Sequence, residues 1–555
     1  MSQNQSGLKK SKKKKAPVRR VASMSCTPQQ TKVSNPTLSS SPPHIVFSLS
    51  LDILFFFLVF YFNQLHINHY ISKMSSYEKL PLEPFFEAIE ELKPKFIERI
   101  TKAVSIPSVS SDETLRPKVV EMAHFLVDEM KQLGFEDIQL KELGIQPPPV
   151  SDPNLKLPPI VLGRFGQDPK KKNVLVYGHY DVQPALKEDG WASEPFELYQ
   201  DKAKDILYGR GVTDDKGPVV GWLNVIEAHN KLGWELPVNL IVCFEGMEES
   251  GSLGLDELVA KEANEYFKGV DQVTISDNYW LGTKKPVLTY GLRGCNYYQI
   301  IIEGPGADLH SGIFGGIIAE PMTDLIKVMS NLVDSKGKIL IPGVYDMVAP
   351  LTDKENELYD AIDFSVEELN AASGSETSLH DNKQDILKHR WRFPSLSLHG
   401  IEGAFSGAGA KTVIPAKVVG KFSIRTVPDI DSGKLDQLVF KYITAEFEKL
   451  NSPNKFKVEL IHDGNYWVSD PFNESFTAAS KATQDVWGVV PDFTREGGSI
   501  PITLTFEKEL GVDVLLLPMG RGDDGAHSIN EKLDVSNYIN GCKTLGSYLH
   551  YYAKA

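Results

Sequence analysis

The chain has 555 residues, of which 41% are hydrophobic and 24% are charged, which is enough apolar material for a buried core and for more than one domain. Its four cysteines lie far apart and include no CxxC pair, so the sequence predicts neither a disulfide framework nor a thiolate zinc site and fits a reducing compartment. The net charge is -14 although residues 1–74 are basic, and the acidic remainder argues against nucleic acid as a partner, because phosphates require clustered Lys and Arg.

The first 74 residues differ in character from the rest of the chain. Basic residues crowd the segment from Lys9 to Arg20, and Ser/Thr/Pro-rich sequence follows, which predicts a disordered basic extension. Residues 45–62 form an apolar run interrupted by Asp52. The run is just long enough for a membrane anchor, it lacks the cleavage site of a secretory signal, and it is not translated if synthesis begins at Met74. We favour a start at Met74 and a cytoplasmic protein, with a membrane anchor at 45–62 as the alternative.

Residues 75–291 and 464–555 show the pattern of helices packed on a sheet. Apolar positions between Pro117 and Gly134 recur at helical spacing, which predicts an amphipathic helix that ends at the glycine. A short apolar run at Val174–Tyr177, and others like it, alternate with helical stretches. We therefore predict an α/β domain in two parts, with a mixed, largely parallel sheet and flanking helices.

The pattern changes between residues 292 and 463. Strand-like segments at Tyr297–Ile302 and Val418–Arg425 accompany two helical stretches and a polar, irregular insert around Ala371–Asp385. We predict that residues 292–463 form an inserted α+β domain.

Candidate metal-binding residues follow the predicted strands. His179 and Asp181 lie at the C-terminal end of an apolar strand, which is where open α/β sheets bind their ligands. Since they are two residues apart they share a face, so that His179 can offer a ring nitrogen to a metal while Asp181 supports the imidazole. A lone histidine at a strand end is more often structural, and this pair alone leaves both interpretations open.

Acidic residues recur in the same kind of position. Glu248 and Glu249 directly follow an apolar strand, where a pair of like charges is costly unless cations compensate it. Asp214 lies in a glycine-rich turn, for which a surface turn is the alternative interpretation. Asp277 follows a short apolar strand and His527 lies in a loop after a further strand, and each is ambiguous by itself.

Together these segments resemble the M20 family of co-catalytic metallopeptidases across nearly all of residues 80–555. Within that family they are most similar to the cytosolic non-specific dipeptidases and the fungal Cys-Gly metallodipeptidase of glutathione degradation. The resemblance implies a zinc-exopeptidase fold, an inserted lid or dimerisation domain, a homodimer and two divalent metal ions, Zn²⁺ or Mn²⁺. It also implies a cis peptide bond after Asp214. The implied ligands are His179 and Asp277 for one ion, Glu249 and His527 for the other, and Asp214 for both.

The same resemblance implies catalytic roles for three further residues. Glu248 is the implied general base, which takes a proton from a metal-bridging water to give the attacking hydroxide. Asp181 is counted among the catalytic residues because it supports the imidazole of His179. His310 is implied to enter the active site of the partner subunit, where it contacts the substrate and stabilises the oxyanion. A structural hydrogen bond in a loop is the alternative interpretation of His310.

Three positions match the substrate contacts of the family, namely Thr412 and Arg425 for the C-terminal carboxylate, and Ser499. An arginine for the carboxylate and an acidic, metal-rich pocket for the amino end favour short peptides such as Cys-Gly. We therefore predict a dipeptidase. The alternatives are an acyl-amino-acid deacylase or carboxypeptidase of the same family, and a non-catalytic metal-binding homologue, against which the full set of ligands argues.

Overall fold

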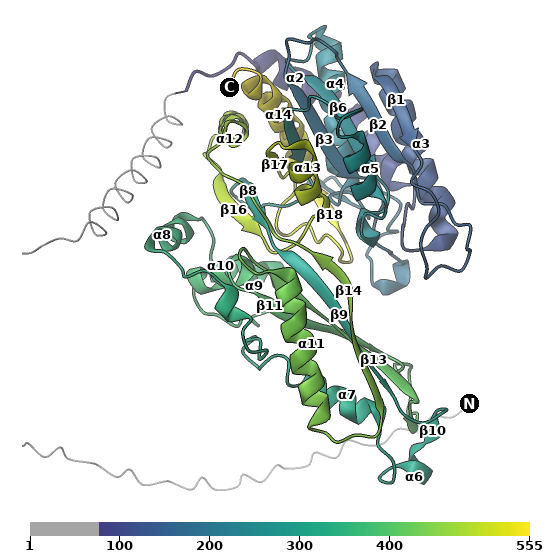
Figure 1. The fold of residues 1–555 in the computed structure, drawn as a ribbon. Helices are drawn as coiled ribbons and strands as arrows, with labels where there is room; N and C mark the ends of the chain where they lie inside the picture. Colours follow the sequence, from purple (N-terminus) through teal and green to yellow (C-terminus); the bar gives the residue numbers. More distant parts are fainter. Residues whose placement is uncertain (1–76) are drawn as a thin grey trace, which may run out of the picture. The chain divides into compact units, whose positions relative to one another are not determined.

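The computed structural model describes residues 77–555, so the predictions for residues 1–74 lie outside the described part of the chain. Its largest element is a nine-stranded sheet (Figure 1). One of the nine strands, β16 (Asp492–Glu496), lies outside the main order and pairs with β8. In sheet order the other strands are β1 (Glu136–Lys141), β2 (Ile160–Phe165), β6 (Asn239–Glu245), β3 (Asn173–His179), β7 (Gln272–Ile275), β17 (Val514–Leu516), β8 (Val287–Leu292) and β15 (Trp467–Val468).

The sheet is parallel at its centre and antiparallel towards its edges. Strands β6, β3, β7 and β17 pair in parallel, whereas β1, β2 and β15 pair antiparallel to their neighbours. The register aligns the ends of the central strands, because His179 in β3 lies opposite Glu245 in β6. The predicted α/β class with a mixed sheet is confirmed.

Helices cover both faces of this sheet. Alternate residues of β3 point to opposite faces, so that Val174 and Val176 join one apolar cluster while Leu175 and Tyr177 join another. The helix predicted to end at Gly134 is α3, and that glycine has the left-handed φ of 91° that favours glycine. The first cluster includes α2 (Glu83–Val104), α3 (Arg116–Leu133), α4 (Lys216–Leu232), α12 (Glu474–Trp487) and α14 (Val535–Tyr552), and the second includes α5 (Leu255–Glu262) and α13 (Ile502–Leu510).

A second sheet lies along the chain between β8 and β15. Its four strands are antiparallel, and α7 (Pro321–Met329) and α11 (Ser432–Glu448) pack against it in a separate apolar cluster. The chain returns to the large sheet where Trp467 of β15 pairs with Leu292 of β8. The limits 292–463 for an inserted domain stay a prediction. The strands are β11 (Ser395–Glu402), β13 (Lys417–Thr426), β9 (Gly294–Glu303) and β14 (Lys455–Gly464), in sheet order.

The prediction of two helical stretches between residues 292 and 463 was wrong. Besides α7 and α11, this part of the chain contains α6 (Ser311–Phe314), α8 (Asp353–Ala361), α9 (Val366–Ser373) and α10 (Lys383–Trp391). These helices are short and present few apolar residues, so their sequence shows little helical periodicity.

Two small sheets were not predicted, because their strands are only two or three residues long. One consists of β18 (Lys532–Asp534), β5 (Ile206–Tyr208) and β4 (Tyr199–Asp201), and the other of β10 (Leu309–His310) and β12 (Val413–Ile414). Within residues 77–555, no helix has the length and apolar character needed to cross a bilayer. The apolar run at 45–62 lies outside these residues.

Candidate metal centre

The predicted metal ligands come together beyond the carboxyl ends of the central strands. His179 is the last residue of β3, and Asp277 lies two residues after β7. Glu249 lies in the short 3-10 turn η3 (Glu248–Ser250) that follows β6, and His527 lies in the loop after β17. Parallel strands that end at one edge therefore bring together side chains from positions far apart in the sequence.

The five predicted ligands form two groups that share Asp214. Its Oδ1 atom lies 3.1 Å from His179 Nε2, and its Oδ2 atom lies 3.1 Å from His527 Nε2. Asp277 Oδ1 lies 3.7 Å from His179 Nε2, while Glu249 Oε2 lies 3.1 Å from His527 Nε2. In each group the donor atoms lie within 4.8 Å of one another. The peptide bond between Asp214 and Asp215 is cis, as the resemblance implies.

The charges at this site are unbalanced in a way that divalent cations would correct. Burial raises the pKa of Asp277 to about 6 and raises the pKa of Glu248 well above its ordinary value. Hydrogen bonds to Asp214 and Glu249 raise the pKa of His527 to about 11. The four carboxylates of Asp214, Glu248, Glu249 and Asp277 outnumber the two imidazoles at this site, and divalent cations would supply the missing positive charge. Imidazole nitrogens and carboxylate oxygens suit Zn²⁺ and tolerate Mn²⁺, so the residues present fit the implied metals.

Asp181 contacts three residues of this centre. Its Oδ1 and Oδ2 atoms accept hydrogen bonds from the backbone N–H groups of Glu248 and Glu249, at 3.2 and 3.1 Å. His179 Nδ1 lies 3.1 Å from the main-chain carbonyl of Asp181 and 3.4 Å from its Oδ1 atom. The nearest acceptor for this imidazole is thus the backbone oxygen, and the Asp181 carboxylate mainly holds the η3 turn.

The structure places the four predicted substrate contacts in two separate pairs within one chain. Arg425 Nη1 donates to Ser499 Oγ at 3.0 Å. His310 is exposed and pairs with Val413, beside the exposed Thr412. Val413 precedes β13, and Arg425 lies near the other end of that strand, so about 26 Å of extended chain separates Lys417 at its start from Arg425. His310 and Thr412 therefore do not lie beside Arg425 and Ser499 of the same chain.

Sequence reasoning missed residues that contact this centre or the loop of Ser499. Gln183 Nε2 donates to Glu249 Oε2 at 2.6 Å, and Asp215 Oδ2 accepts the backbone N–H of His179 at 3.1 Å. Arg293 donates to the carbonyl of Gly497, next to the loop of Ser499. Gln183 and Asp215 lie within four residues of a predicted ligand, whereas Arg293 lies near no predicted site residue in the sequence. In each case the sequence gives no signal that distinguishes these side chains from ordinary polar ones.

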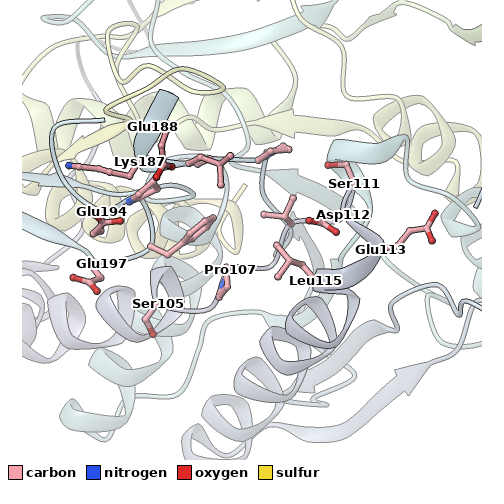
Figure 2. Close-up of a pocket in the computed structure, with 16 residues that line it drawn as sticks. Ser105, Pro107, Ser111, Asp112, Glu113, Leu115, Lys187, Glu188, Glu194 and Glu197 are labelled. Carbon is pink, nitrogen blue, oxygen red and sulfur yellow. The ribbon is translucent and has the colours of Figure 1, made fainter. Parts of the chain in front are cut away.

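A cavity of about 1040 Å³ lies outside the predicted metal centre (Figure 2). None of the predicted site residues is among the residues that line it. Figure 2 shows acidic side chains on its walls, and these are Asp112, Glu113, Glu188, Glu194 and Glu197. The cavity takes no part in the chemistry proposed below.

Comparison with known proteins identifies a family and several similar chains. The model of peptidase family M20/M25/M40 matches residues 175–551. The Cys-Gly metallodipeptidase DUG1 of Candida albicans is 88% identical over 485 residues, which cover 87% of this chain and 100% of that protein. The Cys-Gly metallodipeptidase DUG1 of Saccharomyces cerevisiae is 69% identical over 474 residues, which cover 85% of this chain and 98% of that protein.

Two solved structures are also similar. The dipeptidase Dug1p from Saccharomyces cerevisiae superposes with a TM-score of 0.83 at 69% identity, and the match covers 86% of this chain and 99% of that chain. Human carnosine dipeptidase 1 superposes with a TM-score of 0.82 at 41% identity, over 86% of this chain and 100% of that chain. The resemblance inferred from the motifs is confirmed. Because the family model matches most of the chain and relatives of this identity are covered almost completely, the chain belongs to peptidase family M20/M25/M40.

Proposed function

We propose that the chain is a dipeptidase that hydrolyses short peptides such as Cys-Gly with two divalent metal ions, Zn²⁺ or Mn²⁺. The observation that carries the proposal is the pair of donor groups that share Asp214, with Glu248 beside them. Relatives that are 88% and 69% identical are named Cys-Gly metallodipeptidases, and identity at this level over nearly their whole length supports the same class of substrate.

The proposed ligands divide the two ions between them. His179 and Asp277 would hold one ion, Glu249 and His527 would hold the other, and Asp214 would contact both through its two carboxylate oxygens. The bound ions would supply Lewis-acid catalysis and lower the pKa of water. The ends of β3 and β7 hold His179 and Asp277 in place, whereas Asp214 and His527 lie in a turn and a loop.

Glu248 is the proposed general base. The bond from its backbone N–H to Asp181 Oδ1 fixes it next to the ligand Glu249. Burial raises the pKa of its carboxyl group, which makes the carboxylate a stronger base than that of an exposed glutamate. A carboxylate with such a pKa can take a proton from the attacking water and return it to the leaving amine.

Arg425 and Ser499 are the proposed contacts of the substrate carboxylate. The bond from Arg425 to Ser499 leaves further guanidinium N–H groups free to bind a carboxylate. Burial, together with the charge of Arg425, lowers the pKa of the neighbouring Arg293 to about 10. Two guanidinium groups close together with little water favour an anion between or beside them. The distance between this anion site and the metal centre would then limit the length of the peptide.

We further propose a homodimer in which the partner subunit supplies His310 and Thr412. Both residues are exposed, and both are separated from Arg425 by the length of β13. The same end of the second sheet exposes apolar side chains, since Ile313 and Ile317 are 67% and 74% exposed. A contact with a second copy of the chain would bury these isoleucines and complete the substrate site.

One experiment tests the class of enzyme and the substrate together. The full-length protein is stripped of metal with a chelator, restored with Zn²⁺ or Mn²⁺, and assayed with Cys-Gly and with an N-acetylated dipeptide. The variants are Glu248→Gln and, as a control, Glu262→Gln, which removes the charge of another buried glutamate that is paired with Lys141 outside the metal centre.

We expect metal-dependent cleavage of free Cys-Gly by the parent and by Glu262→Gln, and a loss of roughly 10³-fold or more in Glu248→Gln. Cleavage restricted to the acetylated compound would make the chain a deacylase. If a longer peptide is added to the same assay, its cleavage from the C-terminus in preference to Cys-Gly would make the chain a carboxypeptidase. A folded, metal-loaded protein that cleaves neither substrate would favour a non-catalytic homologue.

We also propose that the enzyme acts in the cytoplasm. The three cysteines among residues 77–555, Cys243, Cys295 and Cys542, are free, which suits a reducing compartment. Cell fractionation and N-terminal sequencing of the native protein test this proposal. Recovery in the membrane fraction with residues 45–62 present would overturn it.

A further inference from the structure

A buried glutamate lies between the loops that carry two of the proposed ligands. The side chain of Glu531 is completely buried, and its carboxylate accepts four hydrogen bonds. Its Oε1 atom accepts the backbone N–H groups of Thr213 and Asp214, at 3.0 and 3.1 Å. Its Oε2 atom accepts the backbone N–H of Gly211 at 2.9 Å and Arg210 Nη1 at 2.8 Å. This one carboxylate therefore fixes the backbone of the turn that ends at Asp214.

Arg210 continues the connection to the loop of His527. While Nη1 binds Glu531, Nη2 donates to the carbonyl of Ser528 at 3.1 Å, and Ser528 is the residue next to His527. The guanidinium lies 5.1 Å from the ring centroid of Trp191 and only 3% of Arg210 is exposed, so that its position is fixed on several sides.

The loop of His527 needs such support because of its own backbone. His527 has a φ of 60° and Asn530 a φ of 59°, and both lie in the left-handed region that is unfavourable for residues with a Cβ atom. The side chain of His527 is also 58% exposed, so that packing does little to hold it. Hydrogen bonds to the loop backbone must therefore keep His527 close to Asp214.

We propose that Glu531 and Arg210 are positioning residues that set the placement of Asp214 relative to His527, and with it the affinity of the Asp214–Glu249–His527 group for its metal ion. The inference rests on the proposed two-metal function. According to this inference, Glu531 and Arg210 affect the metal affinity of the Asp214–Glu249–His527 group more than that of the other group. The His179–Asp214–Asp277 group contains no residue of the His527 loop and depends less on the pair.

The test uses a substitution that keeps the size of the side chain. In Glu531→Gln an amide NH₂ group replaces one carboxylate oxygen and faces two N–H donors, so that hydrogen bonds on one side of the group are lost. Arg210→Lys is the second variant, because a lysine cannot bridge Glu531 and Ser528 with a planar group. The control is Glu227→Gln, which removes the same charge from a buried pair with Arg99, at 2.6 Å, between α4 and α2.

The readout is metal binding, followed by calorimetric titration with Zn²⁺ and by the absorption spectrum of bound Co²⁺, in full-length protein freed of metal. We expect two ions in the parent. In Glu531→Gln one ion should bind as in the parent and the second roughly 10–100-fold more weakly, with a changed Co²⁺ spectrum. Arg210→Lys should show a smaller shift in the same direction. Glu227→Gln should lower the thermal midpoint but bind both ions normally.

Two results separate this inference from the proposed function. If folded Glu531→Gln and Arg210→Lys bind both ions with the affinity and spectrum of the parent, Glu531 and Arg210 have a structural role only and the inference is overturned. If the binding of both ions is weakened equally, the proposed selective effect on one group is overturned. If instead the parent binds two ions, the variants lose one selectively and no protein cleaves Cys-Gly, the inference holds and the proposed substrate fails.

Discussion

At the scale of single residues, Asp181 holds the turn that carries both the proposed base and a proposed ligand. Its two carboxylate oxygens accept the backbone N–H groups of Glu248 and Glu249, and the side chain is fully buried. Asp181→Asn keeps the volume but directs an amide NH₂ group at one of the two donors, so the turn must shift. We expect kcat for Cys-Gly to fall roughly 10–100-fold with a smaller change in KM, measured by steady-state kinetics.

Asp112→Asn is a matched control for this prediction. Asp112 also accepts a backbone N–H, that of Thr114, but in an exposed turn. Its substitution should leave kcat and KM within about twofold of the parent, as expected for surface changes. If Asp181→Asn behaves in the same way, the bonds to the η3 turn do not matter for catalysis.

Arg425 offers a prediction about the substrate rather than the base. Arg425→Lys keeps the positive charge but loses the planar pair of donors that binds a carboxylate, which corresponds to about 1.5–3 kcal/mol. We expect kcat/KM for Cys-Gly to fall roughly 10–100-fold by the same arithmetic. The comparison substrate is cysteinyl-glycinamide, which lacks the carboxylate. Parent and variant should cleave it equally, and an equal loss on both substrates would show that Arg425 acts through the fold.

The proposed ligands could be singled out in the sequence because each follows an apolar strand or lies in a turn or loop near one, where an acid or a histidine is conspicuous. Glu531 and Arg210 could not, although they hold two of these ligands. Their bond joins positions 321 residues apart, and no local pattern reports such a contact. Arg293 escaped notice for the same reason, since its partner Gly497 is 204 residues away.

At the scale of elements, two histidines meet where α4 packs on α14. His229 Nε2 lies 3.0 Å from His550 Nε2, and the rings stack with centroids 5.2 Å apart. His229 Nδ1 lies 2.8 Å from the carbonyl of Val225 and therefore carries the proton, so that its Nε2 accepts a hydrogen bond from His550. Both rings are neutral in this arrangement. Burial lowers the pKa of His229, and burial together with the charges of His229 and Lys554 lowers the pKa of His550 to about 4.

This pair should make the fold sensitive to acid. Between pH 6.5 and about 4 the unfolded chain binds a proton at His550 that the folded chain does not bind, so stability falls as the pH falls through this window. The slope is about 1.4 kcal/mol per pH unit. His550→Gln keeps a donor for His229 but cannot titrate, and we expect its thermal midpoint to fall less steeply than that of the parent between pH 6.5 and 4.5. The measurement uses metal-free protein in chelator, which removes the effect of metal loss. Parallel pH curves would contradict the prediction.

The elements themselves were predictable where periodicity is strong. The strand β3 and the helix α3 coincide with the expected segments, because a continuous apolar run marks the buried strand and helical spacing of apolar residues marks the helix. The helices α8, α9 and α10 begin at polar caps, Thr352, Ser365 and Asn382, whose side chains accept backbone N–H groups. Caps, rather than apolar spacing, define these short helices, so a search for periodicity misses them.

At the scale of the whole molecule, the order of the segments could be predicted from patterns in the sequence. The same patterns do not show that one chain keeps its proposed substrate contacts apart. The change in pattern after residue 292 indicated a second sheet before the chain returned to the first, and β9 and β15 follow that order. No pattern in the sequence shows that β13 separates His310 from Arg425, because this depends on the register of β13 against β9 and on the pairing of His310 with Val413. That separation leads to the proposed exchange of residues between subunits.

Mixing two inactive variants tests this exchange. His310→Ala lacks the residue offered to the partner, and Glu248→Ala lacks the base of its own site. If His310 acts across subunits, a mixed dimer has one site with the Glu248 of one chain and His310 of the partner subunit, and a second site that lacks both. Random exchange makes half of the dimers mixed, so about a quarter of the parental activity should return. The measurement is Cys-Gly hydrolysis after subunit exchange, which differently tagged chains and mass analysis of the dimers confirm. If His310 acts within its own chain, every site lacks one essential group, and confirmed mixed dimers without activity would refute the exchange.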